Sequence, residues 1–230
     1  MIEMKWLLFV GFWFRDIVKG KPELAAFDRP ISRETLITRG KILLIDDVTP
    51  PILAHLKKQG FGITHDRTGK NTSDIERHRY DVVILDFGGV GKTYGPDEGL
   101  SLLRHIRRVS PATYILAFTS LSLHSKQAEF YTLSDGILNK DVGLQEAQEV
   151  LEDALRESMQ IERHWNGLLQ LTGVDPKSTT AKSLKAELIK SLRFHKASYV
   201  KRAVSTLLDR SQEELVASGL EKILSIGSAT

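Results

Sequence analysis

Acidic side chains follow two of the apolar runs in this sequence. Asp46 and Asp47 come directly after residues 42–45, and Asp86 follows residues 82–85. Three carboxylates that meet in one place repel each other unless a cation lies among them. Mg²⁺ is the fitting cation, because it prefers hard oxygen ligands and keeps several of its waters. A carboxylate held beside Mg²⁺ can attack a phosphorus centre, so the pattern indicates chemistry that forms an aspartyl phosphate.

Two further polar residues follow apolar runs in the same way. Thr119 comes after residues 114–118, and Lys140 comes soon after residues 137–138. The oxygens of an incoming phosphoryl group need a cation and a hydroxyl donor. Lys140 and Thr119 are the residue types that fill those two roles.

The elements that must position these residues are predicted from the apolar pattern. Continuous apolar runs of four or five residues are typical of strands buried on both faces, as in a parallel sheet, and residues 62–65 supply a further strand. Helical spacing is found between the runs, at residues 52–59, 98–109 and 123–133. This alternation predicts an open, doubly wound α/β sheet, in which functional groups gather beyond the carboxyl ends of the strands.

The sequence becomes helical after Lys140. Apolar residues recur at steps of three and four from Leu144 to Leu168, which predicts one long helix over residues 144–171 that projects towards a partner. Gly173 and the Asp175-Pro176 pair end it, and a second helical group follows. We therefore divide the chain into an N-terminal hydrophobic segment and linker (1–39), an α/β domain (40–155) and an all-helical region (156–230).

Four segments carry a family resemblance: residues 41–47, 80–86, 115–120 and 136–140. Together they resemble the receiver domain of bacterial two-component response regulators, over residues 40–155. The resemblance implies a five-stranded, flavodoxin-like sheet. It also implies a role in signal transduction, with a histidine kinase as the donor of the phosphoryl group.

The same resemblance assigns roles to the site residues. Asp86 would be the phosphoacceptor, with Asp46 and Asp47 beside it as ligands of Mg²⁺. Thr119 would be the switch hydroxyl, and Lys140 would pair with the phosphate. The protein would then be a phosphoprotein and not an enzyme, with self-phosphotransfer and autodephosphorylation as its only chemistry. The helical region would read the change through a homodimer, a protein partner or nucleic acid.

Three departures from the receiver pattern favour an alternative. Asp141 follows Lys140 where receivers have proline, and Ile137 stands where they have an aromatic residue. The loop between Asp86 and Gly99 is also longer than usual. The alternative is a receiver-like adaptor or structural module that is not phosphorylated.

The enlarged loop contains Gly-Gly-Val-Gly-Lys-Thr at residues 88–93, which invites comparison with a nucleotide-binding P-loop. A P-loop that ended at Thr93 would need its first glycine at the position of Asp86. We therefore expect the loop to cover or modulate the carboxylate site.

Composition sets wider limits. The chain has 230 residues, 41% of them hydrophobic, and no cysteine, so disulfides and thiolate metal sites are excluded. Its longest apolar run, residues 6–14, is too short to span a membrane. We expect this segment to be buried against the body or across a dimer; peripheral membrane contact through residues 4–19 is the alternative. The expected location is the cytoplasm, or the membrane surface if that alternative holds.

Charge is concentrated near the C-terminus. Residues 177–210 hold nine Lys or Arg and two acids, a net +7 in a chain whose total is +3. Such a tract is either a solvated helical face or a surface for nucleic acid. His164, within the helical pattern, is expected to be an ordinary surface histidine.

Overall fold

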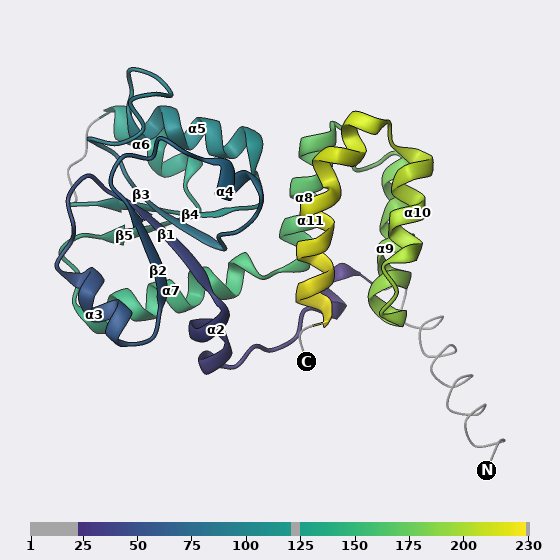
Figure 1. The fold of residues 1–230 in the computed structure, drawn as a ribbon, viewed down its shortest axis with the longest axis horizontal. Coiled ribbons are helices and arrows are strands. Elements are labelled where there is room, and N and C mark those ends of the chain that lie inside the picture. Colours follow the sequence, from purple (N-terminus) through teal and green to yellow (C-terminus); the bar gives the residue numbers. More distant parts are fainter. Residues whose placement is uncertain (1–22, 121–124, 229–230) are drawn as a thin grey trace, which may run out of the picture.

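The computed structural model describes residues 23–120 and 125–228 (Figure 1). Five parallel strands form one sheet in the order β2-β1-β3-β4-β5. The strands are β1 (Lys41–Ile45), β2 (Gly62–Asp66), β3 (Val82–Asp86), β4 (Tyr114–Thr119) and β5 (Gly136–Asn139). This order, which reverses direction between β1 and β3, is that of a flavodoxin-like doubly wound sheet. The predicted fold class is confirmed.

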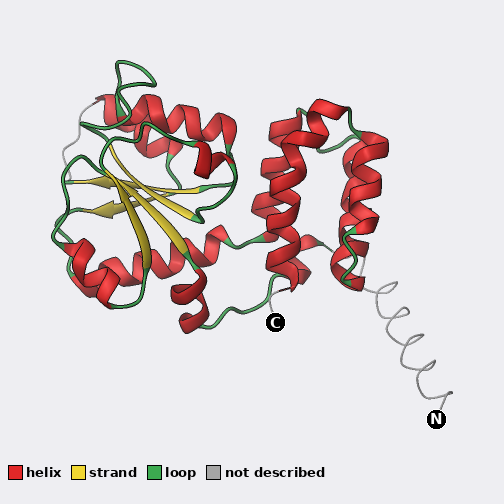
Figure 2. Cartoon of the chain, viewed as in Figure 1, coloured by secondary structure: helices red, strands yellow, loops and turns green. Residues whose placement is uncertain are grey.

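Helices cover both faces of the sheet (Figure 2). One face carries α2 (Arg33–Arg39), α3 (Ile52–Lys58) and α7 (Leu144–Ser158), and the other carries α4 (Ser73–Glu76), α5 (Gly99–Val109) and α6 (Ser125–Leu133). Alternate strand residues enter the two cores: in β1, Ile42 and Leu44 pack with α7, whereas Leu43 and Ile45 pack with α5. Burial on both faces explains why each run is continuously apolar.

The rest of the described chain is a helical bundle beside the sheet domain (Figure 1). It consists of α8 (Ile161–Thr172), α9 (Thr179–Phe194), α10 (Ser198–Leu207) and α11 (Arg210–Ser228), joined by the short 3₁₀ helix η1 (Leu24–Phe27) from the N-terminal side. Its core is separate from those of the sheet domain and includes Leu24 together with Trp165, Leu188 and Ile223.

The prediction of a single helix over residues 144–171 is wrong. The chain leaves helical geometry at Gln160, whose ψ of 127° is extended, and this separates α7 from α8. The apolar seam continues across the break because its two halves serve different cores: Leu151 packs against the sheet, whereas Trp165 and Leu168 pack in the bundle. Asp28 Oδ1 accepts a hydrogen bond from the first backbone N–H of α8, at Ile161 (2.9 Å). The seam therefore joins two domains within one chain.

The bundle is attached to the sheet domain by charged contacts. Arg163 of α8 forms an ion pair with Asp135 (2.7 Å), which also accepts a bond from the Ile115 backbone N–H at 2.7 Å. Lys222 of α11 pairs with Asp81, whose other oxygen accepts from Lys41 N at 2.8 Å. Asp81 precedes β3 and Lys41 begins β1, so the bundle holds the amino ends of the two strands that end in the site carboxylates.

His164 also lies in this interdomain contact. It is buried, in contrast to the surface position expected from sequence, and its Nε2 lies 2.8 Å from the Ser158 carbonyl oxygen. Burial, with the nearby charge of Lys222, lowers the pKa of His164 to about 4. A neutral imidazole therefore forms part of the packing between the domains.

The hydrophobic segment at residues 6–14, like the whole of residues 4–19, lies outside the described part of the chain. Among residues 23–120 and 125–228, every helix is too short or too polar to cross a membrane.

Candidate functional site

Lys140 joins two carboxylates at the carboxyl edge of the sheet. Its Nζ donates to Asp46 Oδ2 at 2.9 Å and lies 3.0 Å from Asp86 Oδ2. Asp46 and Lys140 directly follow β1 and β5, and Asp86 ends β3, so the contact joins strands that are far apart in sequence. Asp46 is almost fully buried, so without Lys140 its negative charge would have no paired cation in a poorly solvated environment.

Asp47 completes a cluster with Asp46 and Asp86. One oxygen from each of the three carboxylates lies within 4.8 Å of the others. The three side chains differ in solvent exposure: Asp46 is buried, Asp86 is half-buried and Asp47 is exposed. Three hard oxygen donors with one side open to solvent suit Mg²⁺, which keeps part of its water shell when bound. The three predicted metal-ligating residues are therefore brought together.

The contact between Asp86 and Lys140 changes the pKa values of both side chains. Burial raises the pKa of the Asp86 carboxyl, Asp46 raises it further, and the hydrogen bond and charge of Lys140 oppose the rise. At Lys140, burial favours the neutral amine, but the two carboxylates outweigh it and raise the pKa. Lys140 is thus held charged, while ionised Asp86 is less stable than a carboxylate in water.

This raised pKa predicts a stability effect of Asp86→Asn in Mg²⁺-free buffer. A carboxyl whose pKa is higher in the folded than in the unfolded state stabilises the fold below its unfolded value, near 3.8, and loses that contribution as the pH rises through the folded value. The variant, which lacks this loss, should have a higher thermal midpoint than the wild type at pH 7. The difference should shrink as the pH falls towards 4. A difference in thermal midpoint that does not change with pH would contradict a raised pKa at Asp86.

Thr119 ends β4 beside the acceptor strand, where Phe118 is the register partner of Asp86. The Thr119 side chain is buried, and its hydroxyl accepts a hydrogen bond from the Tyr131 hydroxyl of α6 (3.1 Å). The Lys140 backbone N–H donates to the Thr119 carbonyl oxygen at 2.8 Å. The predicted hydroxyl and cation are therefore on adjacent strands. Tyr131 was not predicted, because nothing in the sequence pairs it with Thr119.

Residues at the end of β2 hold the backbone of the carboxylate pair. His65 Nε2 lies 2.8 Å from the Asp46 carbonyl oxygen, and the Arg67 guanidinium donates twice to the Asp47 carbonyl oxygen, at 2.8 and 3.0 Å. Sequence reasoning missed both residues. Their position after a neighbouring strand was the available signal, but it does not say which backbone atom they reach.

The glycine-rich loop does not have the arrangement of a P-loop. A P-loop lysine and its following Ser or Thr open a helix, whereas α5 begins at Gly99, well after Lys92 and Thr93. The loop instead approaches the carboxylates: a Cβ on Gly89 would lie 2.2 Å from Asp47 Oδ2. This agrees with the expectation that the loop covers the site.

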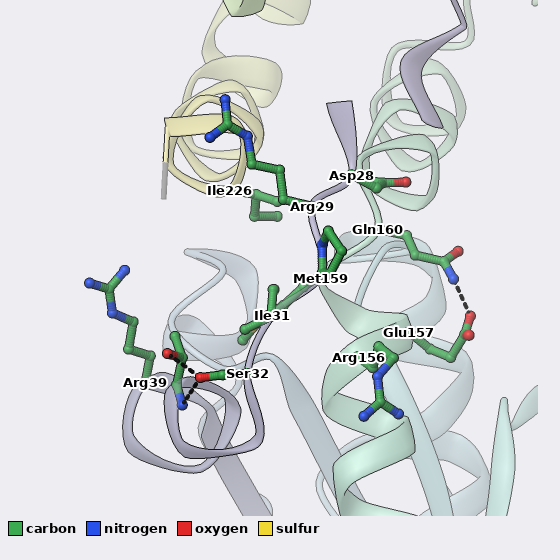
Figure 3. A pocket seen from close by; sticks show the side chains of 12 residues that line it. Asp28, Arg29, Ile31, Ser32, Arg39, Arg156, Glu157, Met159, Gln160 and Ile226 are labelled. Carbon is green, nitrogen blue, oxygen red and sulfur yellow. Dashed lines mark hydrogen bonds between the residues drawn. The ribbon is translucent and has the colours of Figure 1, made fainter. Parts of the chain in front are cut away.

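A crevice of about 540 Å³ lies elsewhere, between the linker, α2, the end of α7 and α11 (Figure 3). It is at the amino end of the strands and so lies away from the carboxylates. Ile31, Met159 and Ile226 line it, and the guanidinium groups of Arg29, Arg39 and Arg156 lie apart from one another. These arginines do not converge on a common ligand position.

Comparison with solved structures finds receiver domains. One is a CheY-like response regulator receiver domain protein from Methanospirillum hungatei (20% identity, TM-score 0.44), which matches 52% of this chain and 95% of its own. Another is the chemotaxis protein CheY4 of Vibrio cholerae (22%, TM-score 0.42), over 50% of this chain and 98% of its own.

The sheet domain is similar in fold to receiver domains. NtrX from Brucella abortus matches more of the chain, 66%, at 18% identity and a TM-score of 0.45, but only 34% of NtrX is covered. No model of a known protein family matches the sequence, and no curated protein matches it.

Proposed function

We propose that this receiver-like domain accepts a phosphoryl group on Asp86 and that the helical bundle responds to its arrival. The observation that carries the proposal is the contact of Lys140 Nζ with both Asp46 and Asp86, next to Asp47. A structural ion pair needs one carboxylate for one lysine. Three carboxylates and one lysine leave an excess of negative charge that suits a divalent cation.

The chemistry follows from the two oxygens of Asp86. Oδ1 accepts from the Phe87 backbone N–H (2.8 Å) and Oδ2 contacts Lys140, so the carboxylate is held in one orientation. A carboxylate oxygen attacks phosphorus, and the bond from phosphorus to the donor breaks, at nitrogen in a phosphohistidine or at oxygen in acetyl phosphate. The electron pair of that bond leaves with the donor.

The surrounding residues stabilise charge on the transferred group. Lys140 pairs with a phosphoryl oxygen once Asp86 is phosphorylated, and the Thr119 hydroxyl donates to another. Asp46, Asp47 and Asp86 would hold Mg²⁺, which when bound offsets the negative charge of the phosphoryl oxygens. The phosphodonor for such a site is a histidine kinase.

The bundle is the element that reads the site in this proposal. It contacts the amino ends of β1 and β3 through the ion pair of Lys222 with Asp81. A change at Asp86 can therefore reach α11 along one strand. The bundle then acts through a homodimer or another protein, or through nucleic acid at residues 177–210, where exposed Phe194 and Tyr199 lie among lysines and arginines.

A receiver-like adaptor that is not phosphorylated is the second candidate. Ile137, at the position of the receiver aromatic residue, is 45% exposed on the edge strand β5. An adaptor of this kind would bind its partner equally well with and without a phosphate mimic. Under this candidate, Mg²⁺ with beryllofluoride leaves the oligomeric state and the partner affinity unchanged.

Acetyl phosphate labelling tests the proposal. With Mg²⁺, the wild-type protein should gain the mass of one phosphoryl group, and Asp86→Asn should gain none. Asp66→Asn is the matched control, because Asp66 ends β2 at the same sheet edge but lies outside the cluster of three carboxylates. Equal labelling of Asp86→Asn and the wild type would overturn the acceptor assignment.

A further inference from the structure

The loop between β3 and α5, residues 87–98, is held down at several points. The Gly91 backbone N–H donates to the Thr68 carbonyl oxygen (2.9 Å), which attaches the loop to the segment after β2. Gly89 and Gly91 have φ values of 77° and 70°, a conformation that glycine adopts without strain. With Gly89 packed against the carboxylate of Asp47, the loop lies against the exposed side of the site.

Glu98 holds this loop in place through its side chain. Its Oε2 accepts a hydrogen bond from the Gly89 backbone N–H at 2.6 Å, and Lys92 Nζ lies 3.9 Å from its Oε1. A charged acceptor makes this bond stronger than one between neutral groups. One carboxylate therefore joins the two halves of the loop directly beside Asp47.

The backbone of Glu98 is strained. Its φ of 50° and ψ of −117° lie outside the regions that a residue with a side chain normally adopts. The next residue is equally restricted: a Cβ on Gly99 would lie 2.2 Å from the Asp86 carbonyl oxygen, and Gly99 N donates to the Phe87 carbonyl oxygen at 3.1 Å. Strain of this kind persists where surrounding contacts require it, often at functional sites. Here the contacts attach the next residue, Gly99, to the end of the acceptor strand.

We propose that Glu98 is a positioning residue that clamps the loop over the carboxylates and thereby protects the aspartyl phosphate from water. This inference rests on the proposed function. In hydrolysis a water oxygen attacks phosphorus, the bond from phosphorus to the Asp86 oxygen breaks, and the carboxylate and inorganic phosphate are released. A loop held against Asp47 restricts the approach of that water. Releasing the loop should shorten the lifetime of the phosphorylated state.

Two substitutions separate a clamp from a catalytic base. Glu98→Gln keeps an oxygen that can accept from Gly89 N, whereas Glu98→Ala removes the acceptor. A clamp predicts dephosphorylation about 10-fold faster in Glu98→Ala, the shift expected from losing one charge-assisted hydrogen bond. In Glu98→Gln, whose neutral oxygen still accepts a weaker bond, the rate should lie between those of the wild type and Glu98→Ala. If Glu98 instead activated water, both substitutions would slow dephosphorylation, and the proposal would be overturned.

Hydrogen exchange tests the clamp without phosphorylation. In the wild type, the bonded N–H groups of Gly89, Gly91 and Tyr94 should exchange slowly. In Glu98→Ala they should exchange faster, with Glu98→Gln between the two, while the amides of β3 and α5 keep their protection. Unchanged loop exchange in Glu98→Ala would refute the clamp. Failure of the wild type to accept phosphate, with the exchange result as expected, would refute the proposed function and leave the clamp in place.

Discussion

Lys140→Met should reduce acetyl phosphate labelling by about 100-fold, the typical loss when one preorganised charge-stabilising donor is removed. The substitution keeps an unbranched apolar stem and removes the cation that lies 2.9 and 3.0 Å from Asp46 and Asp86. Asp46 and Asp86 then lose their neutralising lysine, which favours protonation of one of them. A protonated Asp86 is a poor nucleophile, and the transferred phosphoryl group also loses its partner. Initial labelling rates by intact mass spectrometry measure the effect.

Lys92→Met is the control for this experiment. Lys92 lies in the loop beside the site, but its side chain is 68% exposed and its contact with Glu98 is long, at 3.9 Å. Pairs of this kind contribute little. Lys92→Met should label within a few-fold of the wild type, and an equal loss in both variants would show that general positive charge, not the bridge at Lys140, supports the reaction.

Lys222→Met should lower the free energy of unfolding by about 3–5 kcal/mol, because it leaves a buried carboxylate without its cation. The side chain of Asp81 is 4% exposed, and within the described residues its remaining hydrogen-bond partner is the Lys41 backbone N–H. The loss should appear in urea unfolding followed by circular dichroism. It should also separate the transitions of the two domains, since Lys222 joins the bundle to the sheet domain.

Lys190→Met provides the comparison on the bundle surface. Lys190 pairs with Glu187 three residues earlier on α9, where its side chain is 52% exposed, and such pairs contribute less than about 1 kcal/mol. Similar losses of unfolding free energy in Lys190→Met and Lys222→Met would mean that the interdomain pair stabilises the protein no more than a surface pair does. Lys222 would then not be a physical link between the bundle and β3.

Much of the sheet domain could be predicted from the sequence, because strands and helices alternate along the chain and each strand is a continuous apolar run. The four apolar runs that precede the polar site residues are strands within a residue or two of their expected limits, and residues 62–65 are part of β2. Parallel strands place their carboxyl ends at one edge, so polar residues that follow the runs must meet there. That geometry places Asp46, Asp86 and Lys140 at one edge, but their contact also needs the long Lys140 side chain to reach past β4, which separates β5 from β3.

The other features depend on contacts that spacing does not encode. The apolar seam of residues 144–171 keeps its period through Gln160, although its two halves belong to different cores. His164 reads as a surface histidine until the bundle is placed against the sheet domain. Glu98 looks like the start of a helix, and its bond with Gly89 appears only once the loop has folded back.

Localising the phosphoryl group is the most direct test of the central proposal. The protein is treated with acetyl phosphate and Mg²⁺, reduced with borohydride, which converts an aspartyl phosphate to homoserine, and digested for peptide mass spectrometry. Conversion should occur at Asp86, with Asp46 and Asp47 unchanged. Conversion at another residue, or none in a protein whose fold is intact, would contradict the proposed function.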